Sequence, residues 1–473
     1  MEQKSRTRKF GAADRFGYFL GDFGNNILNV IVGSYLLVYC TKVLGISAGV
    51  VGVILMASRF FDAFTDFGMG RISDSYQDKK GERYRVWILR FCVPIVLSVI
   101  LLYHPWVAEQ SMAAKIAYVS LMYVIYGSVC FTAINIPYGA MINAISDDPV
   151  ERSSLSKYRT YGGLVAQVVV MMAIPALAYT KDAAGNTLVA KNGFLTCAIV
   201  LGAITLVSYL GCYFGCKERI KGTAQPAKEQ EKKSGGLKES VAVLAEICKD
   251  PCLLGMIVAS IMVSAVATIF ATLLPYVAID YFNAPWIQSV GGLAMIVGAI
   301  IITPFANKIT TRFGKKEGSV AGLTVCGVFF VLALLVPRTQ PVLFAVMLIL
   351  AFAGFGYFYL VMFALIADAI DHHYALTGKK NEGTIYGVYS FLRKLAGAVT
   401  GSIGAWSLAA IGYDSLATVQ TASVQTAVFR IGVLIPACLF AIAAVCLAFL
   451  CPLNSKAIAA DRAKIAEMEA TKE

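Results

Sequence analysis

Three charged residues lie close together in an apolar stretch near the start of the chain. The segment Arg59–Asp74 reads RFFDAFTDFGMGRISD, and the stretch before it, SAGVVGVILMAS, carries no charge. Arg59, Asp62 and Asp66 have the spacing i, i+3, i+7, which places all three on one stripe of a helix. Because burying a charge in apolar surroundings is costly unless the charge is paired, this stripe requires a partner.

Asp62 and Asp66, one helical turn apart, form a candidate cation site. Two carboxylates this close repel each other, and burial disfavours the charged form of both. A bound cation or a shared proton relieves the repulsion. Thr65 and Thr132 are candidates to add neutral oxygens, and a set of oxygen ligands suits a hard monovalent cation. The alternative is an Arg59–Asp62 ion pair that only ties helices together, which leaves Asp66 without support.

Two further apolar stretches, GDFGNNILN and FTAINIPYGAMINAISDD, carry polar side chains that are candidates to line a polar cavity. The positions are Asp22, Asn25, Asn26 and Asn29 in the first stretch and Thr132, Asn135 and Tyr138 in the second. We expect Pro137 to break the local helical hydrogen bonding, which is tolerated at membrane depth only where protein or a wet cavity satisfies the backbone. Hydrogen bonds between helices, with no ligand, are the alternative for both stretches.

Cationic side chains mark two more apolar segments. We expect Arg159 to open the fifth helix, where it either contacts a substrate or anchors the helix on the positively charged side of the membrane. Lys394 lies about a third of the way into the eleventh helix, too far from its end to snorkel easily, so an internal acidic or anionic partner is expected. His372 and His373 close the tenth helix and are interpreted as surface residues.

The elements that carry these residues are membrane-spanning helices. The chain has 473 residues, of which 58% are hydrophobic and 15% charged, a composition typical of a polytopic membrane protein. Apolar stretches long enough to cross a bilayer recur along the whole chain. Twelve spans are expected near residues 16–41, 46–70, 86–104, 116–145, 160–180, 193–216, 252–280, 285–307, 317–336, 341–370, 384–411 and 427–451.

The basic residues of the chain indicate its orientation. Most of the 41 Lys and Arg residues fall in the two ends and in every second loop. The opposite loops hold only Lys42, Lys115, Lys181, Lys191 and Arg338. The positive-inside rule therefore places both termini in the cytoplasm. The net charge of +12 is explained by this topology, so nucleic-acid binding is not expected.

A polar stretch near the middle, KERIKGTAQPAKEQEKKSGGLKES, divides the spans six and six. The predicted parts are an N-terminal bundle at 1–216, a cytoplasmic linker at 217–250, a C-terminal bundle at 251–451 and a cytoplasmic tail at 452–473. Basic turns follow the second helix of each half, which indicates two pseudo-symmetric bundles facing a midplane substrate site. The sequence contains no G-x-x-x-x-G-K-[ST] loop, so uphill transport would draw on an ion gradient.

Several stretches of the chain resemble the motifs of a known family. The stretches GDFGNNI, RFFDAFTDFGMGRISD, NIPYGAM, IADAID and TIYGVYSFLRKLAGAVTGSI are similar to motifs of the glycoside–pentoside–hexuronide:cation symporters of the major facilitator superfamily. The second stretch follows their R-x-x-D-x-x-x-D-P-x-x-G-x-x-x-D pattern, with Phe67 in place of the proline. The resemblance covers nearly the whole chain and is closest to the glucuronide-carrier and melibiose-permease type.

The resemblance implies roles for single residues. The coupling cation would be held by Asp62, Asp66 and Thr132, with Lys394 in coupling, and Asp22, Arg159 and Tyr359 would contact the sugar. Further candidates from the residues themselves are Arg59 for coupling and Asn26, Asn135 and Tyr138 for the sugar. Two positions depart from the melibiose permease. Asn135 replaces an aspartate that binds galactoside there, and Gly139 replaces a tryptophan that stacks on the sugar, so a different sugar is expected.

The sequence therefore predicts an all-α membrane protein with the major facilitator fold. The expected function is import of a glycoside, first a glucuronide or other hexuronide, by alternating access in a bacterial cytoplasmic membrane. Coupling to Na⁺ or H⁺, no other metal, no cofactor and action as a monomer are expected. A xyloside or galactoside symporter, a cation-coupled lysolipid transporter and a sugar sensor are the alternatives. An enzyme is not expected, since no nucleophile–base constellation appears.

Overall fold

The computed structural model describes residues 8–78, 81–220, 250–378 and 382–470; a few side chains inside these ranges, that of Lys394 among them, lie outside the description. The chain divides into two compact units. Unit 1 comprises Met1–Lys233 with Tyr413–Thr418, and unit 2 comprises Ser234–Gly412 with Val419–Glu473. The predicted linker contains the boundary between them, and most of that linker, 221–249, lies outside the described residues.

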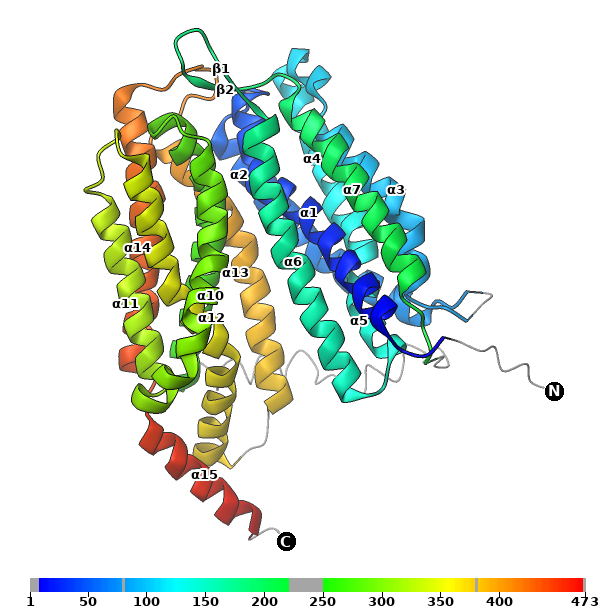
Figure 1. Cartoon of the computed structure of the whole chain (residues 1–473), viewed down its shortest axis with the longest axis vertical. Helices are drawn as coiled ribbons and strands as arrows, with labels where there is room; N and C mark the ends of the chain where they lie inside the picture. The colour runs from blue at the N-terminus through cyan, green and yellow to red at the C-terminus, as the bar shows by residue number, and fades with distance from the viewer. Residues whose placement is uncertain (1–7, 79–80, 221–249, 379–381, 471–473) are drawn as a thin grey trace, which may run out of the picture. The chain divides into compact units, whose positions relative to one another are not determined.

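Unit 1 is built from long apolar helices and one small hairpin (Figure 1). Its elements are α1 (Ala12–Lys42), α2 (Ala48–Ser75), α3 (Arg85–Leu102), the 3-10 helix η1 (Pro105–Glu109), α4 (Met112–Val124), the π-helix η2 (Ile125–Phe131), α5 (Thr132–Ile145), α6 (Pro149–Leu177), strands β1 (Tyr179–Lys181) and β2 (Thr187–Val189), and α7 (Gly193–Gly215). The consecutive helices α4, η2 and α5 form a single span, the fourth of the unit. In the antiparallel hairpin, Tyr179 lies opposite Val189.

Unit 2 is likewise built from long apolar helices, but it has no hairpin among its described residues. Its elements are α9 (Pro251–Tyr276), the π-helix η3 (Val277–Tyr281), α10 (Trp286–Phe313), α11 (Lys315–Ala333), α12 (Pro341–Thr377), α13 (Glu382–Ala410), α14 (Ala422–Leu450) and α15 (Ser455–Ala470). In the described part of both units, 11 helices are long and apolar enough to cross a membrane, and α13 has a shorter apolar part at Leu395–Ala410. These helices agree with the twelve predicted spans.

The helices pack in the same order in both units. In unit 1, α1 packs against α6 and α7, α3 packs against α7, and the fourth span packs against α2 and α3. In unit 2, α9 packs against α13 and α14, α11 packs against α14, and α12 packs against α10 and α11. Numbering the spans one to six within each unit makes these pairs identical. The two six-helix bundles are therefore two versions of one arrangement, as expected of an internal repeat.

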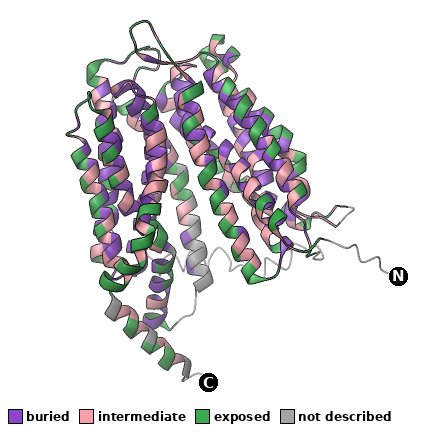
Figure 2. Ribbon diagram, viewed as in Figure 1, coloured by how far each residue is buried: buried purple, intermediate pink, exposed green. Residues whose placement is uncertain are grey.

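Apolar side chains lie on the outside of the helices as well as inside. Exposed positions run along the lengths of the helices in both units (Figure 2), and among them are large apolar residues such as Phe64, Val331 and Phe449. A water-soluble protein rarely exposes so much contiguous apolar surface. This surface is the expected consequence of contact with lipid.

Two helix bounds differ most from prediction. Helix α6 begins at Pro149, not near residue 160, because the Asp148 carboxylate caps its first turn by accepting from Val150 N at 2.7 Å. Its first turns are polar, so hydropathy alone misses them. Arg159 consequently lies well inside the helix and does not open it. Helix α12 continues to Thr377, where Gly378 ends it in the left-handed conformation with φ 68°.

The expected break at Pro137 does not end its helix. Pro137 lies inside the continuous helix α5, and the departure from α-helical geometry comes earlier, in η2. A proline lacks the N–H that would bond four residues back, but this loss does not by itself require the helix to end. The wide turns of η2 instead bring a different set of side chains to the neighbouring helix α2, as described below.

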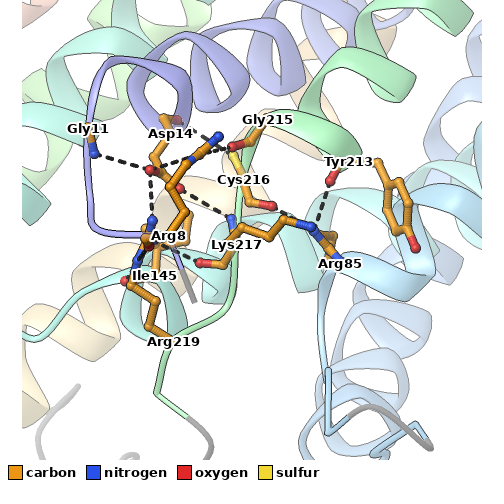
Figure 3. Close-up of polar contacts among 10 residues, drawn as sticks. All are labelled: Arg8, Gly11, Asp14, Arg85, Ile145, Tyr213, Gly215, Cys216, Lys217 and Arg219. Atoms are coloured by element: carbon orange, nitrogen blue, oxygen red, sulfur yellow. Dashed lines mark hydrogen bonds and ion pairs between the residues drawn. The ribbon is translucent and has the colours of Figure 1, made fainter. Parts of the chain in front are cut away.

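A buried carboxylate fixes the end of unit 1 at which α1 begins (Figure 3). Asp14 forms ion pairs with Arg8 at 3.0 Å and Arg219 at 2.8 Å, and it accepts from the backbone N of Lys217 at 3.2 Å. Nearby, Arg85 donates to the carbonyl of Cys216 at 2.8 Å. These contacts tie the start of α1 to the residues that follow α7, so the first and sixth spans are held together before the chain leaves the unit.

A second buried pair lies at the start of α9 in unit 2. Asp250 caps the helix by accepting from Cys252 N at 2.9 Å, and its other oxygen lies 2.7 Å from Nδ1 of His373. His373 is buried, so its interpretation as a surface residue is wrong: tertiary packing gives it a partner far away in sequence. Its neighbour His372 contacts Asp461 of α15 at 2.8 Å.

Candidate functional site

Asp62 and Asp66 lie on α2 and face the fourth span of unit 1. Ser128 Oγ donates to Asp62 Oδ1 at 2.5 Å, and Thr132 Oγ1 donates to Asp66 Oδ1 at 2.8 Å. Each carboxylate therefore receives one hydroxyl from the same neighbouring span. Thr132 lies beside Asp66 as the candidate ion site requires, and both carboxylates point to the same side of α2.

Arg59 is only loosely associated with this pair. Its Nη1 atom lies 3.9 Å from Asp62 Oδ2, at the limit of an ion pair, and 43% of its side chain is exposed. A separation of 3.9 Å is longer than a normal hydrogen bond between the two groups. The Arg59–Asp62 tie is therefore a weak explanation for two carboxylates in an apolar helix.

Thr65 is placed differently from the other candidates. Its hydroxyl donates to the backbone carbonyl of Asp62 at 3.0 Å, within its own helix. This hydrogen bond is common for threonine in membrane helices and occupies the hydroxyl proton. The oxygen keeps its lone pairs, but the geometry gives Thr65 no contact with either carboxylate comparable to that of Thr132.

Ser128 and Gly127 are the members of this site that sequence reasoning missed. Both lie in η2, and a Cβ atom built at Gly127 would come within 3.2 Å of Asp62 Oδ1. A usable signal was present: Ser128 precedes Thr132 by four residues, just as Asp62 precedes Asp66. The matched spacing predicts two pairs of contacts between facing helices. The π-helical geometry has no sequence signature of this kind.

A second polar group joins α1 to α6 in the same unit. Arg159 Nε lies 3.1 Å from Asp22 Oδ1, and Asn26 Nδ2 donates to Asp22 Oδ2 at 2.8 Å. A Cβ at Gly163 would lie 3.0 Å from Asp22 Oδ2, so glycine leaves the room that this carboxylate occupies. The structure thus brings together Asp22 and Asn26, which the sequence placed in one apolar stretch, with Arg159 from another helix.

Arg159 presents part of its guanidinium away from Asp22. Its contact with Asp22 uses Nε, its Cζ lies 5.4 Å from the centre of the Tyr138 ring, and 42% of its side chain is exposed. An arginine held on one edge and on one face keeps an edge with further N–H donors. Such an edge can bind a carboxylate or sulfonate through two parallel hydrogen bonds.

Tyr138 lies beneath this arginine. Its ring stacks on that of Tyr18 at 4.6 Å, and its hydroxyl donates to Tyr18 O at 2.6 Å. The residue is fully buried, so its face supports Arg159 and its hydroxyl is already engaged. Asn135, three residues earlier on α5, is partly exposed. A Cβ atom at Gly139 would have nothing within 4 Å of it, so there is open space beside Tyr138.

Two of the predicted residues lie in unit 2. Tyr359 on α12 is exposed, and its ring stacks with that of Phe355 at 5.9 Å. Lys394 belongs to α13, but its side chain lies outside the described residues. The roles assigned to both residues stay predictions.

Residues 17–455 match the family model of the MFS/sugar transport proteins. The chain belongs to this family. The match covers the spans of both units, and it confirms the predicted family and the major facilitator fold. The transporter is therefore a multi-pass membrane protein and not an enzyme.

Proteins named as sugar carriers are among the relatives of this transporter. It is 29% identical over 445 residues to the glucuronide carrier protein homolog of Escherichia coli (strain K12), covering 93% of this chain and 92% of that protein. It is also 29% identical over 416 residues to a putative sulfoquinovose importer of Salmonella typhimurium (strain LT2), covering 86% of this chain and 83% of that protein.

Solved structures agree on the fold. A bacterial homologue of the iron transporter ferroportin, in an inward-facing state, superposes with a TM-score of 0.63 and covers 93% of this chain and 98% of that one. The sequences are 14% identical, so the likeness concerns the fold alone. It shows that the architecture of the transporter is shared well beyond sugar carriers.

Proposed function

We propose that the protein is a cation-coupled symporter that imports an anionic sugar by alternating access. The observation that carries the choice of sugar is the Asp22–Arg159–Asn26 group. Asp22 orients the guanidinium through Nε. The exposed edge of Arg159 is then free to bind a carboxylate or sulfonate through two parallel hydrogen bonds. Glucuronide and sulfoquinovose, named for the two relatives above, are both sugars with an acidic group.

The proposed cation site is the pair Asp62 and Asp66, with Thr132. Within the described residues, each carboxylate accepts from one hydroxyl and the loosely held Arg59 lies 3.9 Å from Asp62, so the pair retains negative charge that a monovalent cation would compensate. Binding of the cation and the sugar would then support each other by linkage. Lys394 is proposed as a coupling residue on the family resemblance, and Tyr359 as a sugar contact.

The orientation follows from the distribution of basic residues. We propose a bacterial cytoplasmic membrane protein with both termini in the cytoplasm, since Lys and Arg gather in the two ends and in alternate loops. We propose that the protein works as a monomer, because a single chain contains both packed helix bundles.

Uptake into proteoliposomes tests the proposal. The full chain is supplied with matched labelled sugars, phenyl glucuronide and phenyl glucoside, under an inward Na⁺ or H⁺ gradient. We expect gradient-driven accumulation of the glucuronide and at least tenfold less of the glucoside. Replacing Arg159 by Gln should remove this preference, and Arg159→Lys should restore part of it, since lysine keeps the charge but not the bidentate geometry.

A matched control separates loss of recognition from loss of folding. Arg152 lies on the same helix and donates to the backbone carbonyl of Ser146, so Arg152→Gln removes an arginine from α6 outside the candidate site. It should leave the preference unchanged. Equal transport of the two phenyl sugars by the parent protein would contradict an anionic substrate and favour a neutral xyloside or galactoside.

A further inference from the structure

The fourth span of unit 1 changes its helix type where it meets the two aspartates. The π-helix η2, Ile125–Phe131, interrupts the α-helical geometry between α4 and α5 and packs against both α2 and α3. Such π segments are rare and often occur at functional sites. Helix α12, the equivalent span of unit 2, is α-helical from Pro341 to Thr377. Of these two equivalent spans, only the one that faces Asp62 and Asp66 has a π segment; the other described π-helix, η3, lies at the end of the first span of unit 2.

The π segment delivers a second hydroxyl to the carboxylates. Ser128 lies in η2, is 3% exposed, and approaches Asp62 Oδ1 at 2.5 Å. Thr132 follows directly after η2 and contacts both Asp66 and the carbonyl of Gly127, the latter at 3.2 Å. The two carboxylates of α2 therefore face the two hydroxyls of the fourth span, and on each side the two residues are four positions apart.

The backbone of η2 also lies close to the carboxylates. A Cβ at Gly127 would lie 3.2 Å from Asp62 Oδ1 and 3.6 Å from Oδ2, so the carboxylate rests against the helix where a side chain is missing. A larger residue would displace the carboxylate by a few tenths of an ångström. Gly127 therefore permits the short distance between Ser128 and Asp62.

Two more buried hydroxyls lie close to this contact. Within the described residues, Ser58 Oγ and Tyr126 Oη are buried and make no hydrogen bond. Ser58 precedes Asp62 by one helical turn and so shares its face of α2. Tyr126 belongs to η2 and is near enough to Asp62 to interact with it electrostatically. A buried hydroxyl without a protein partner calls for an explanation, such as a water or an ion that it binds.

We propose that Ser128 is a ligand of the coupling cation and that its oxygen adapts the site to a metal cation, Na⁺ or Li⁺, in preference to a proton. This inference rests on the proposed function of Asp62 and Asp66. A proton needs a single carboxylate oxygen, whereas a hard metal cation requires several oxygens around it. Because a hydroxyl rotates freely, Ser128 and Thr132 can turn their protons away and present lone pairs to the ion.

Ion-dependent thermal unfolding of the purified full chain tests the proposal without requiring a known sugar. A ligand that binds only the folded state raises the melting temperature as its concentration increases. The parent protein is titrated with NaCl or LiCl at constant ionic strength, with choline chloride as the balancing salt. We expect a saturable rise in melting temperature for the parent, and a midpoint at least tenfold higher in Na⁺ for Ser128→Ala.

Two further variants make the result specific. Ser120→Ala is the matched control, since Ser120 lies on α4 of the same span and its hydroxyl donates to Ile116 O at 2.8 Å; its Na⁺ midpoint should equal that of the parent. Ser128→Cys keeps nearly the same shape but replaces the hard oxygen by soft sulfur, so it should also raise the midpoint. If Ser128→Ala does not unfold in a cooperative transition, the Na⁺ midpoint of Ser128→Cys is measured in its place.

Asp66→Asn distinguishes failure of this inference from failure of the proposed function. If Asp66→Asn abolishes the Na⁺ response while Ser128→Ala and Ser128→Cys leave it unchanged, Ser128 is not a ligand and the cation site stands. If Asp66→Asn leaves a clear Na⁺ response intact, the proposed cation site itself is wrong. A parent that responds to pH through Asp66 and to neither Na⁺ nor Li⁺ has a proton site, which overturns the proposed role of Ser128.

Discussion

The second and fourth spans pack against each other in both units, but the chemistry of the two contacts is opposite. In unit 2, α10 and α12 meet through their backbones: a Cβ at Gly298 would lie 2.4 Å from a carbonyl oxygen of α12, and a Cβ at Gly356 would lie 2.6 Å from Ala299 Cα. In unit 1, α2 meets the fourth span through Asp62 and Asp66 and the hydroxyls that they accept from.

The difference indicates that the acidic contact is not required by the fold. Small residues that let backbones approach closely are the usual means of joining membrane helices. Unit 2 uses this means at the same place in the repeat. A carboxylate at the centre of the bilayer, in contrast, costs about 2.5–3.5 kcal/mol on insertion scales. Because an uncharged contact serves the architecture equally well, the carboxylates of unit 1 are better explained by ion binding.

The largest effect is expected from removing the charge that distinguishes the two contacts. Asp62→Asn and Asp66→Asn keep the size of the side chain and one acceptor oxygen but lose the negative charge. Each variant should reach the membrane and bind sugar through the Asp22 group. The sugar that it accumulates should be at least tenfold less than that of the parent protein. Sugar affinity should also lose its dependence on Na⁺ or pH. Surface expression, sugar affinity with and without the ion, and uphill uptake measure these effects.

The purely structural explanation gives a different pattern for the same two variants. Asp62→Asn would then leave Arg59 without its partner and lower expression, while Asp66→Asn would do little. Full accumulation by either variant would contradict the paired cation site. The Asp22→Asn variant is a useful companion, because it should weaken sugar binding and leave the Na⁺-dependent rise in melting temperature unchanged.

An intermediate effect, on stability alone, is expected at the uncharged contact of unit 2. Gly356→Ala places a methyl group against the backbone of α10, and overpacking of this kind costs about 1–3 kcal/mol. The melting temperature should fall while the Na⁺ midpoint of the folded protein stays that of the parent. Gly327→Ala on α11 is the control, since its Cβ would meet only an ordinary contact at 3.7 Å.

The smallest effect is expected from the corresponding change in unit 1. Gly127→Ala crowds the Asp62 carboxylate at 3.2 Å, which is the flexible end of a side chain and can move aside. We expect little loss of stability and a rise of the Na⁺ midpoint by about threefold, or about 0.7 kcal/mol at 1.4 kcal/mol per factor of ten. A loss of stability as large as that of Gly356→Ala, with an unchanged Na⁺ midpoint, would remove the distinction between the two contacts.

Much of the candidate site was readable from the sequence because its residues are costly in their context. Asp62 and Asp66 were found by the charge they bring into an apolar helix and by helical spacing. Thr132 was proposed as a neutral oxygen ligand and through the family resemblance, and the structure places all three at one contact. Asp22 and Arg159 were found in the same way, and the structure joins them at 3.1 Å. Burial of the neutral residues Ser128 and Gly127 costs little, so the one signal for them was the spacing of Ser128 and Thr132, which matches that of Asp62 and Asp66.

Misplaced elements also have a physical cause. Hydropathy finds only the part of a helix that is apolar, so it missed the polar first turns of α6 and put Arg159 at the helix start. His373 was interpreted as exposed because its neighbours in sequence say nothing about Asp250, which reaches it from another helix. The buried Asp14, paired with Arg8 and Arg219, went unnoticed for the same reason.

The sequence by itself determined the membrane class and the family, and it predicted twelve spans divided six and six, with which the described helices are consistent. Each of these follows from composition or from motifs that are local along the chain, and local patterns survive without knowledge of packing. The tertiary structure decided which helices meet, that η2 rather than Pro137 reshapes the fourth span, and that Ser128 reaches Asp62. These depend on the distance between side chains that are far apart in sequence, which only the packed helices fix.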